Sequence, residues 1–204
     1  MNIMNLKFGL TLPHFGEVAA RETILDMAIK AQELNFNSVW ARDHLVFKPH
    51  VLEDPTPNFI ETFITLSAVG TVTDLTLGTS VTFPHRHPLH LAQLYSNLDF
   101  MARGDVIAGV GMGSGKREYE IMEMPFDRRS ELFKETVEII RGVWQGDGSY
   151  QGEFYSFDDA FQYHYQAKYQ YGEGVLLRLR LNVRGSCARG GFQGDLICQV
   201  LEQE

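Results

Sequence analysis

Residues 75–115 constrain the fold more than any other part of the chain. An apolar run ends in a turn-rich loop at Thr82 to Pro88, a helical segment follows, and a second apolar run, Val106 to Val110, leads into glycines at alternate positions. The order strand, loop, helix, strand and glycine loop is typical of a parallel βαβ unit. Because glycines let backbone amides approach a ligand closely, we expect a small molecule to bind where these strands end.

The same alternation extends over the first 145 residues. Each short β-favouring run is followed by a segment with apolar side chains at helical spacing. The predicted strands are Leu6–Leu12, Ser38–Ala41, Leu75–Phe83 and Val106–Val110. The predicted helices are Val18–Leu34, a helix through residues 59–69, one that begins at Pro88, and Asp127–Trp144 with Asp127 as its N-cap. Four βα units predict an α/β fold with a parallel sheet, either open and doubly wound or closed as a barrel, and periodicity does not choose between them.

We expect a single domain over residues 1–204, made of three parts. Residues 1–145 hold the four βα units. Residues 146–171 are rich in Tyr, Phe and Gln and suit an extended or hairpin segment over the rim of the sheet. Residues 172–204 form an atypical tail, which has one alternating stretch at Val175 to Val183 and no further βα rhythm.

Charge and composition exclude several classes of partner. A net charge of −8 and a pI near 5.4 repel polyanions, so we expect neither nucleic acid nor an acidic membrane as partner. No apolar run of about 18 residues could span a bilayer, and the N-terminus lacks the pattern of a signal peptide. These features predict a cytoplasmic protein. Cys187 and Cys198 are too widely spaced for a redox pair and too few for a zinc cage, so two ordinary thiols are expected.

The pair Asp43 and His44 is the first candidate for chemistry. It follows directly on a predicted strand, at the end where parallel α/β folds place their active sites. A carboxylate beside an imidazole offers an acceptor and a group that gives or takes a proton near neutral pH. The alternative is an aspartate that caps a turn beside a surface histidine.

The glycine run GVGMGSG, residues 109–115, is the second candidate. Val110 and Arg117 break the phosphate-loop pattern, and Ser114 stands where the dinucleotide fingerprint needs its last glycine. What remains is an amide-rich strand end for a ribityl chain, a phosphate or a ring edge, and a purely structural turn is the alternative.

The third predicted strand and the loop after it carry further polar residues. Thr79, Ser80 and Val81 place small atoms where the mouth of a barrel would lie, although a plain β-branched strand fits as well. The three histidines of HRHPLH suit polar contacts at the rim, because their spacing is poor for a metal and Arg86 would set a cation against it. We therefore expect no metal. An apolar slot for a flat ring could be lined by Trp40, Phe83 and Met112.

Several separated segments, in this order, resemble one known family. They are FGLTLPHFG, LNFNSVWARDHL, the stretch from Leu75 through the glycine run, and MPFDRRSELFKETVEIIRGVWQG. Over about residues 6–160 the chain resembles the luciferase-like monooxygenase superfamily. The resemblance implies a TIM-type (β/α) barrel that binds either FMN or a reduced coenzyme of the 8-hydroxy-5-deazaflavin type at the C-terminal ends of its strands.

The same resemblance assigns roles to residues. Asp43 and His44 would lie beside the flavin ring as catalytic and cofactor-binding groups, and the matching segments favour the deazaflavin branch. Thr79, Ser80 and Val81 would back the ring, with a non-proline cis peptide at Ser80 and Val81. The ring edge would meet the end of the fourth strand, at Gly111, Met112 and Gly113.

The implied function is that of an oxidoreductase, which transfers a hydride to, or oxygenates, a small organic substrate. Family members have eight βα units and about 300 residues, within the range of such barrels, whereas four units are clear here. The alternatives are a non-catalytic flavin-binding protein and an inactive truncated fragment. Because an unclosed sheet leaves its edges unpaired, a homodimer is a further expectation.

Overall fold

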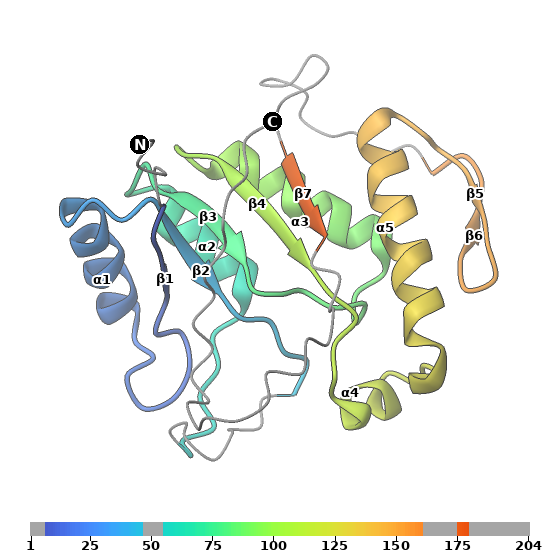
Figure 1. Cartoon of the computed structure of the whole chain (residues 1–204), viewed down its shortest axis with the longest axis horizontal. Coiled ribbons are helices and arrows are strands. Elements are labelled where there is room, and N and C mark those ends of the chain that lie inside the picture. The colour runs from blue at the N-terminus through green and yellow to red at the C-terminus, as the bar shows by residue number, and fades with distance from the viewer. Residues whose placement is uncertain (1–6, 47–54, 161–174, 180–204) are drawn as a thin grey trace, which may run out of the picture.

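The computed structural model describes residues 7–46, 55–160 and 175–179, and its centre is a parallel sheet of five strands (Figure 1). In space the strands follow the order β1-β2-β3-β4-β7. Their bounds are β1 Gly9–Thr11, β2 Ser38–Ala41, β3 Thr76–Thr79, β4 Val106–Val110 and β7 Val175–Leu179. The first four strands are therefore neighbours both in space and in the chain, as successive βαβ crossovers require.

A helix follows each of the first four strands. These helices are α1 Arg21–Glu33, α2 Thr62–Gly70, α3 Pro88–Met101 and α5 Arg129–Gln145. Each packs against the next in chain order, and Figure 1 shows α2 and α3 behind the sheet with α5 beside α3. The short helix α4, Lys116–Ile121, and the 3-10 turn η1, Phe126–Arg128, lie between β4 and α5.

One face of the sheet forms the core with the helices. Val39, Leu77 and Ala108 lie on that face and are completely buried. The helices contribute apolar stripes at helical spacing, and these include Ile24, Ala28, Leu66, Val69, Leu91, Leu98, Val137 and Ile140. Burial of a leucine, isoleucine or valine side chain stabilises the fold by about 1.5–3 kcal/mol. The apolar stripes therefore determine which side of each helix packs against the sheet.

The opposite face of the sheet carries Trp40, which lies across two glycines of the flanking strands. A Cβ atom added at Gly9 or at Gly78 would overlap the indole ring. The indole nitrogen donates a hydrogen bond of 2.9 Å to the hydroxyl of Ser38. The described helices pack on one face of the sheet and Trp40 lies on the other, an arrangement that favours the wall of a barrel over a doubly wound sheet with helices on both faces.

The start of the last helix differs from the prediction. Asp127 is not its N-cap, because α5 begins at Arg129 and Arg128 occupies the cap position. The preceding residues form the 3-10 turn, in which the Arg128 amide donates to the Pro125 carbonyl at 3.0 Å. This turn moves the N-cap of the helix by one residue, from Asp127 to Arg128. At its other end α5 stops at Gly146, whose φ of 96° is the left-handed conformation typical of a glycine C-cap.

After α5 the described chain forms an antiparallel hairpin, with β5 at Tyr150–Gln151 and β6 at Ser156–Phe157. The carboxylate of Glu135, on α5, accepts the amides of the hairpin turn, those of Glu153, Phe154 and Tyr155, at 2.8, 3.0 and 3.2 Å. The alternating stretch that begins at Val175 includes β7, which pairs in parallel with β4. The rest of the two C-terminal segments, including Cys187 and Cys198, lies outside the described residues.

Candidate functional site

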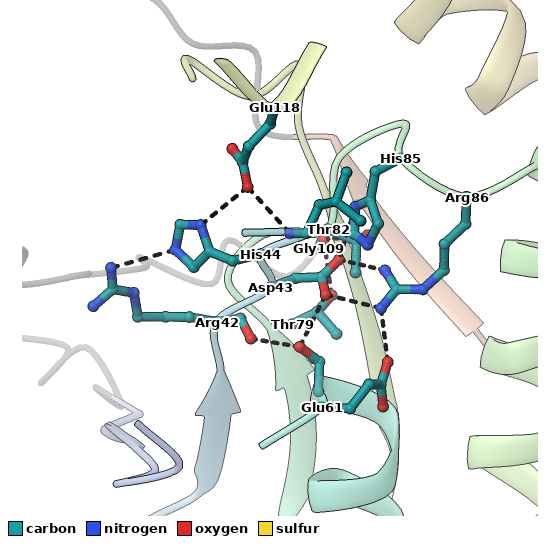
Figure 2. A network of polar contacts seen from close by, with 12 residues as sticks. Arg42, Asp43, His44, Glu61, Thr79, Thr82, His85, Arg86, Gly109 and Glu118 are labelled. Carbon is teal, nitrogen blue, oxygen red and sulfur yellow. Dashed lines mark hydrogen bonds and ion pairs between the residues drawn. The ribbon is translucent and has the colours of Figure 1, made fainter. Parts of the chain in front are cut away.

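The C-terminal ends of β2, β3 and β4 meet at one edge of the sheet, and polar side chains gather there (Figure 2). Asp43 follows β2 and is 4% exposed. The guanidinium of Arg86 donates two hydrogen bonds to its carboxylate, from Nη1 at 2.6 Å and from Nη2 at 3.0 Å, and the Thr62 hydroxyl donates a third at 3.0 Å. The buried charge of Asp43 is therefore paired and hydrogen-bonded, as a buried carboxylate must be.

Arg86 also joins this carboxylate to the start of α2. Its NH2 group donates to Glu61 at 2.7 Å, and the other carboxylate oxygen of Glu61 accepts the Ile64 amide at 2.8 Å as the N-cap of α2. Burial alone would lower the pKa of Arg86, but hydrogen bonds to Asp43 and the charges of both carboxylates raise it. The chain Asp43, Arg86 and Glu61 thus fixes the end of β2, the first turn of α2 and the loop before α3 relative to one another.

His44 lies beside this network and makes its own contacts. Its Nδ1 atom is 3.5 Å from Oε1 of Glu118, on α4, and its Nε2 atom is 3.4 Å from NH2 of Arg42. The ring packs edge-on against Phe59, with 5.6 Å between the centroids. Asp43 and His44 therefore point to different partners, and Figure 2 shows the imidazole directed to Glu118 while the carboxylate faces Arg86.

His85 is the second imidazole at this edge. Its side chain is 5% exposed, and its Nδ1 atom is 3.6 Å from Oδ2 of Asp43 with no hydrogen-bond partner among the described residues. The ring lies against Phe83 at 4.4 Å. Burial lowers the pKa of His85, and the negative charge of Asp43 opposes this shift without reversing it. His85 therefore favours the neutral form, and its Nδ1 atom lies beside the ion pair of Asp43 and Arg86.

The free energy of unfolding is expected to fall as the pH drops below about 6.5, the ordinary histidine pKa. Burial lowers the pKa values of both His14 and His85, so the unfolded chain binds more protons than the folded one in this range. Each histidine contributes a slope of at most about 1.4 kcal/mol per pH unit. Urea unfolding of the wild type and of His85→Phe across this range measures it. The variant should show a shallower slope, and the exposed His90→Asn control should not; a full slope in His85→Phe would contradict the assignment.

Thr79 occupies a different position from the one predicted. Its hydroxyl points to the helices and not to the mouth of the sheet. On the helical side it forms hydrogen bonds with the Tyr95 hydroxyl of α3 at 2.7 Å and with the Gly109 carbonyl at 2.8 Å. The Thr82 hydroxyl bonds the Tyr95 phenol at 2.8 Å and the same carbonyl at 3.2 Å. The reason is the alternation of the strand, because Thr79 shares a face with the buried Leu77. Thr79 therefore ties β3 to β4 and α3.

Ser80, Val81 and the glycine run lie together where β3 and β4 end. The peptide between Ser80 and Val81 is cis, as predicted. The Gly111 amide donates to the Thr82 carbonyl at 2.8 Å, and a Cβ at Gly111 would come within 2.7 Å of a methyl of Val81. Gly113 has a φ of 72° and faces Phe83. Its neighbour Met112 accepts the Tyr119 hydroxyl at its carbonyl.

The sequence does not predict a site role for three residues that make important contacts here. Arg86 is separated from Asp43 by 43 positions, so their pairing requires the folded chain. Glu118 lies on α4, a helix of six residues whose period is too short to detect. Tyr95 lies at helical spacing among apolar residues of α3, and that position gives no sign of the polar contacts that its hydroxyl makes.

The remaining candidate groups take structural positions. His87 accepts the Leu89 amide at 3.3 Å as the N-cap of α3, directly before Pro88. Of the residues expected to line an apolar slot, Trp40 lies over the glycines of β1 and β3, and Phe83 packs on His85 and Tyr119. Within residues 7–46, 55–160 and 175–179, no three His, Cys, Asp or Glu side chains are grouped as metal ligands would be.

Proteins of similar sequence and structure identify the family of the chain. The profile of the luciferase-like monooxygenase family matches residues 6–168. The chain belongs to this family. Structural similarity extends to the F420-dependent secondary alcohol dehydrogenase in complex with an F420-acetone adduct, with a TM-score of 0.65 and 25% identity over 79% of this chain and 49% of that one. The fold is therefore that of a TIM-type barrel of which the first four βα units are present, as predicted.

Curated members of the luciferase-like family resemble the chain over a similar range. An F420-dependent glucose-6-phosphate dehydrogenase of Microbacterium testaceum is 34% identical over 76% of this chain and 48% of its own length. An F420-dependent hydroxymycolic acid dehydrogenase of Mycobacterium tuberculosis is 29% identical over 74% of this chain and 42% of its own length. The chain thus spans about half the length of the curated relatives it matches.

In the described part of the chain, no helix has the length and apolar character that crossing a membrane requires.

Proposed function

We propose that the chain carries the coenzyme-binding half of a flavin- or deazaflavin-dependent oxidoreductase, with an 8-hydroxy-5-deazaflavin coenzyme as the preferred partner. The observation that carries this proposal is the Asp43 and His44 pair directly after β2, at the same end of the sheet as the residues that follow β3 and β4, where Ser80, Val81 and the glycine run lie. The F420-dependent relatives support the deazaflavin over FMN. Their names as dehydrogenases support a hydroxyl-bearing organic substrate.

The residues at this edge fit a flavin-type ring. Gly111 and Gly113 present backbone without side chains, and Gly113 has a positive φ that other residues rarely adopt. Ser80, Val81 and Met112 would contact the ring from the ends of β3 and β4. His85 offers a buried polar atom without a hydrogen-bond partner among the described residues. Apolar surface, glycine backbone and a few polar groups together are typical of cofactor sites.

In the proposed reaction the coenzyme supplies the hydride chemistry. The chain contributes position and proton transfer. The paired charges of Asp43 and Arg86 hold the end of β2 in place, so that the imidazole of His44 remains fixed relative to β3 and β4. His44 would take the hydroxyl proton of an alcohol substrate or return it to a carbonyl oxygen, which is the usual work of a histidine near neutral pH.

Titration of the purified chain with the deazaflavin coenzyme and, separately, with FMN tests the proposal. We expect absorbance changes that saturate in the micromolar range with the deazaflavin. Gly113→Ala should weaken binding about tenfold, a loss of about 1.4 kcal/mol, because the new methyl group enters the site beside Phe83. Gly146→Ala is the matched control. Gly146 also has a positive φ, but no atom lies within 4 Å of a Cβ there.

Each result of this titration has a distinct meaning. Stronger binding of FMN would favour a monooxygenase over a dehydrogenase. Tight binding without turnover of any hydroxyl substrate would indicate a non-catalytic flavin-binding protein. Binding of neither coenzyme in the micromolar range would contradict the proposal and indicate an inactive fragment.

We also propose that the chain forms a homodimer. Gly9 and Thr11 of the edge strand β1 are exposed, and unpaired strand edges favour association. Sedimentation equilibrium would give twice the mass of the 23.2 kDa chain. A stable monomer at all accessible concentrations would contradict this part of the proposal.

A further inference from the structure

We propose that Glu118 is the positioning residue of His44: its carboxylate holds the imidazole in the tautomer protonated at Nδ1 and leaves Nε2 as the basic nitrogen. The use of Nε2 in proton transfer rests on the proposed function. The tautomer itself is a property of the chain without any coenzyme.

Glu118 is held in place by the loop that carries His44. Its Oε1 atom accepts the amides of Leu45 at 3.1 Å and Val46 at 3.5 Å, and lies 3.5 Å from Nδ1 of His44 (Figure 2). The glutamate side chain is 13% exposed and the histidine side chain 24% exposed. The Oε1 atom therefore has three donors around it and acts as their acceptor.

The charge state of Glu118 agrees with this geometry. Burial would raise the pKa of the carboxyl group, but the hydrogen bond and charge of His44 and the two loop amides lower it below its ordinary value. At neutral pH the group is therefore an acceptor without a proton of its own. A carboxylate in this state cannot donate to the imidazole, so the proton between them belongs to Nδ1.

The contact on the opposite side of the ring indicates the same tautomer. Nε2 of His44 lies 3.4 Å from NH2 of Arg42, and a guanidinium nitrogen in a protein donates and never accepts. The contact therefore favours a lone pair on Nε2, but because so long a contact is a weak hydrogen bond it does not fix the tautomer without the carboxylate of Glu118. Glu118 and Arg42 together select one of the two neutral tautomers, in the same way that a carboxylate behind a catalytic histidine fixes its tautomer.

This tautomer determines which atom does the chemistry. When an alcohol is oxidised, the substrate O–H bond breaks and its proton goes to Nε2, while the hydride of the adjacent C–H bond goes to the oxidised coenzyme and a carbonyl group forms. In the opposite direction Nε2 returns the proton to the oxygen. The long contact with Arg42 is a weak hydrogen bond, which a substrate hydroxyl can displace.

The test is a nitrogen-15 NMR measurement on the imidazole rings of the coenzyme-free chain. The spectrum is recorded about two pH units above the ordinary histidine pKa of ~6.5, and His44→Asn identifies the His44 signals. In the wild type we expect Nδ1 protonated and Nε2 unprotonated. Glu118→Ala should shift the population to the Nε2-protonated tautomer that free histidine favours. Glu118→Gln, whose amide oxygen can accept the same bond, should restore most of the original tautomer.

Glu120→Ala is the matched control, because Glu120 lies on the same helix, is exposed and contacts Lys116 at 3.7 Å. It should leave the His44 signals unchanged. A wild-type His44 protonated at Nε2, or a tautomer unchanged in Glu118→Ala, would overturn the inference. The wild-type spectrum decides even if Glu118→Ala fails to fold. An Nδ1-protonated His44 in a chain that binds no coenzyme would refute the proposed function while supporting the positioning role.

Discussion

Arg86→Met is expected to lower the free energy of unfolding by about 3–5 kcal/mol, the usual cost of removing one partner of a buried ion pair. Arg86 is 13% exposed in its side chain and Asp43 1% exposed. Methionine preserves much of the volume beside Phe63, over which the guanidinium lies at 5.3 Å. The loss therefore measures the uncompensated charge of Asp43 rather than a cavity. Equilibrium unfolding in urea gives the value.

The control is Arg103→Met, which removes an arginine from an exposed pair. Arg103 contacts Asp74 at 3.0 Å, and both side chains are more than half exposed. Such pairs contribute about 0–1 kcal/mol. The double variant Asp43→Asn with Arg86→Met should recover part of the stability, because no unpaired charge remains. Losses of equal size in the two single arginine variants would show that Asp43 is not effectively buried.

Gly109→Ala is expected to cost about 3 kcal/mol, at the upper end of the usual range for overpacking. A Cβ on Gly109 would overlap the carbonyl oxygen of Thr79 on the neighbouring strand. The clash is with backbone, so neither strand can relieve it by rotating a side chain. The Gly109 carbonyl also accepts bonds from Thr82 and Tyr95, which a shifted β4 would weaken.

Gly142→Ala provides the comparison, with the same chemical change in a helix. There the new methyl group would lie 2.9 Å from a carboxylate oxygen of Asp147, a side-chain end that can rotate away. Alanine is a better helix former than glycine by about 0.5–1 kcal/mol, so stability should stay the same or rise. Thermal unfolding of both variants measures the contrast. If Gly109→Ala changed the stability as little as Gly142→Ala is expected to, β3 would approach β4 less closely than described.

The fold was largely predictable from sequence because its signals are local. Ser38–Ala41 and Val106–Val110 are strands over the predicted ranges, and Pro88 begins α3. Each of these follows from apolar runs or from proline geometry. The start of α5 was missed because a single 3-10 turn leaves no periodic pattern, and α4 is too short to produce one.

The site was predictable only in part, because its contacts join distant residues. The position of Asp43 and His44 at a strand end marked them as candidates, and the structure pairs Asp43 with Arg86 and places His44 beside them, in contact with Glu118. Their partners Arg86 and Glu118 come from a loop and a helix that no local pattern connects to β2. Thr79 was assigned to the wrong face, although two-residue alternation from Leu77 could have placed it correctly.

The position of Trp40 gives the chain a built-in optical probe. The sequence has two tryptophans, and the second, Trp144, lies on α5 with its indole nitrogen 3.3 Å from the Ala92 carbonyl on the helical side. Trp40 lies on the opposite face of the sheet, over Gly9 and Gly78. In a Trp144→Phe variant, the remaining emission would come from that face. Its wavelength and its quenching would report directly whether another polypeptide or an absorbing chromophore has arrived there.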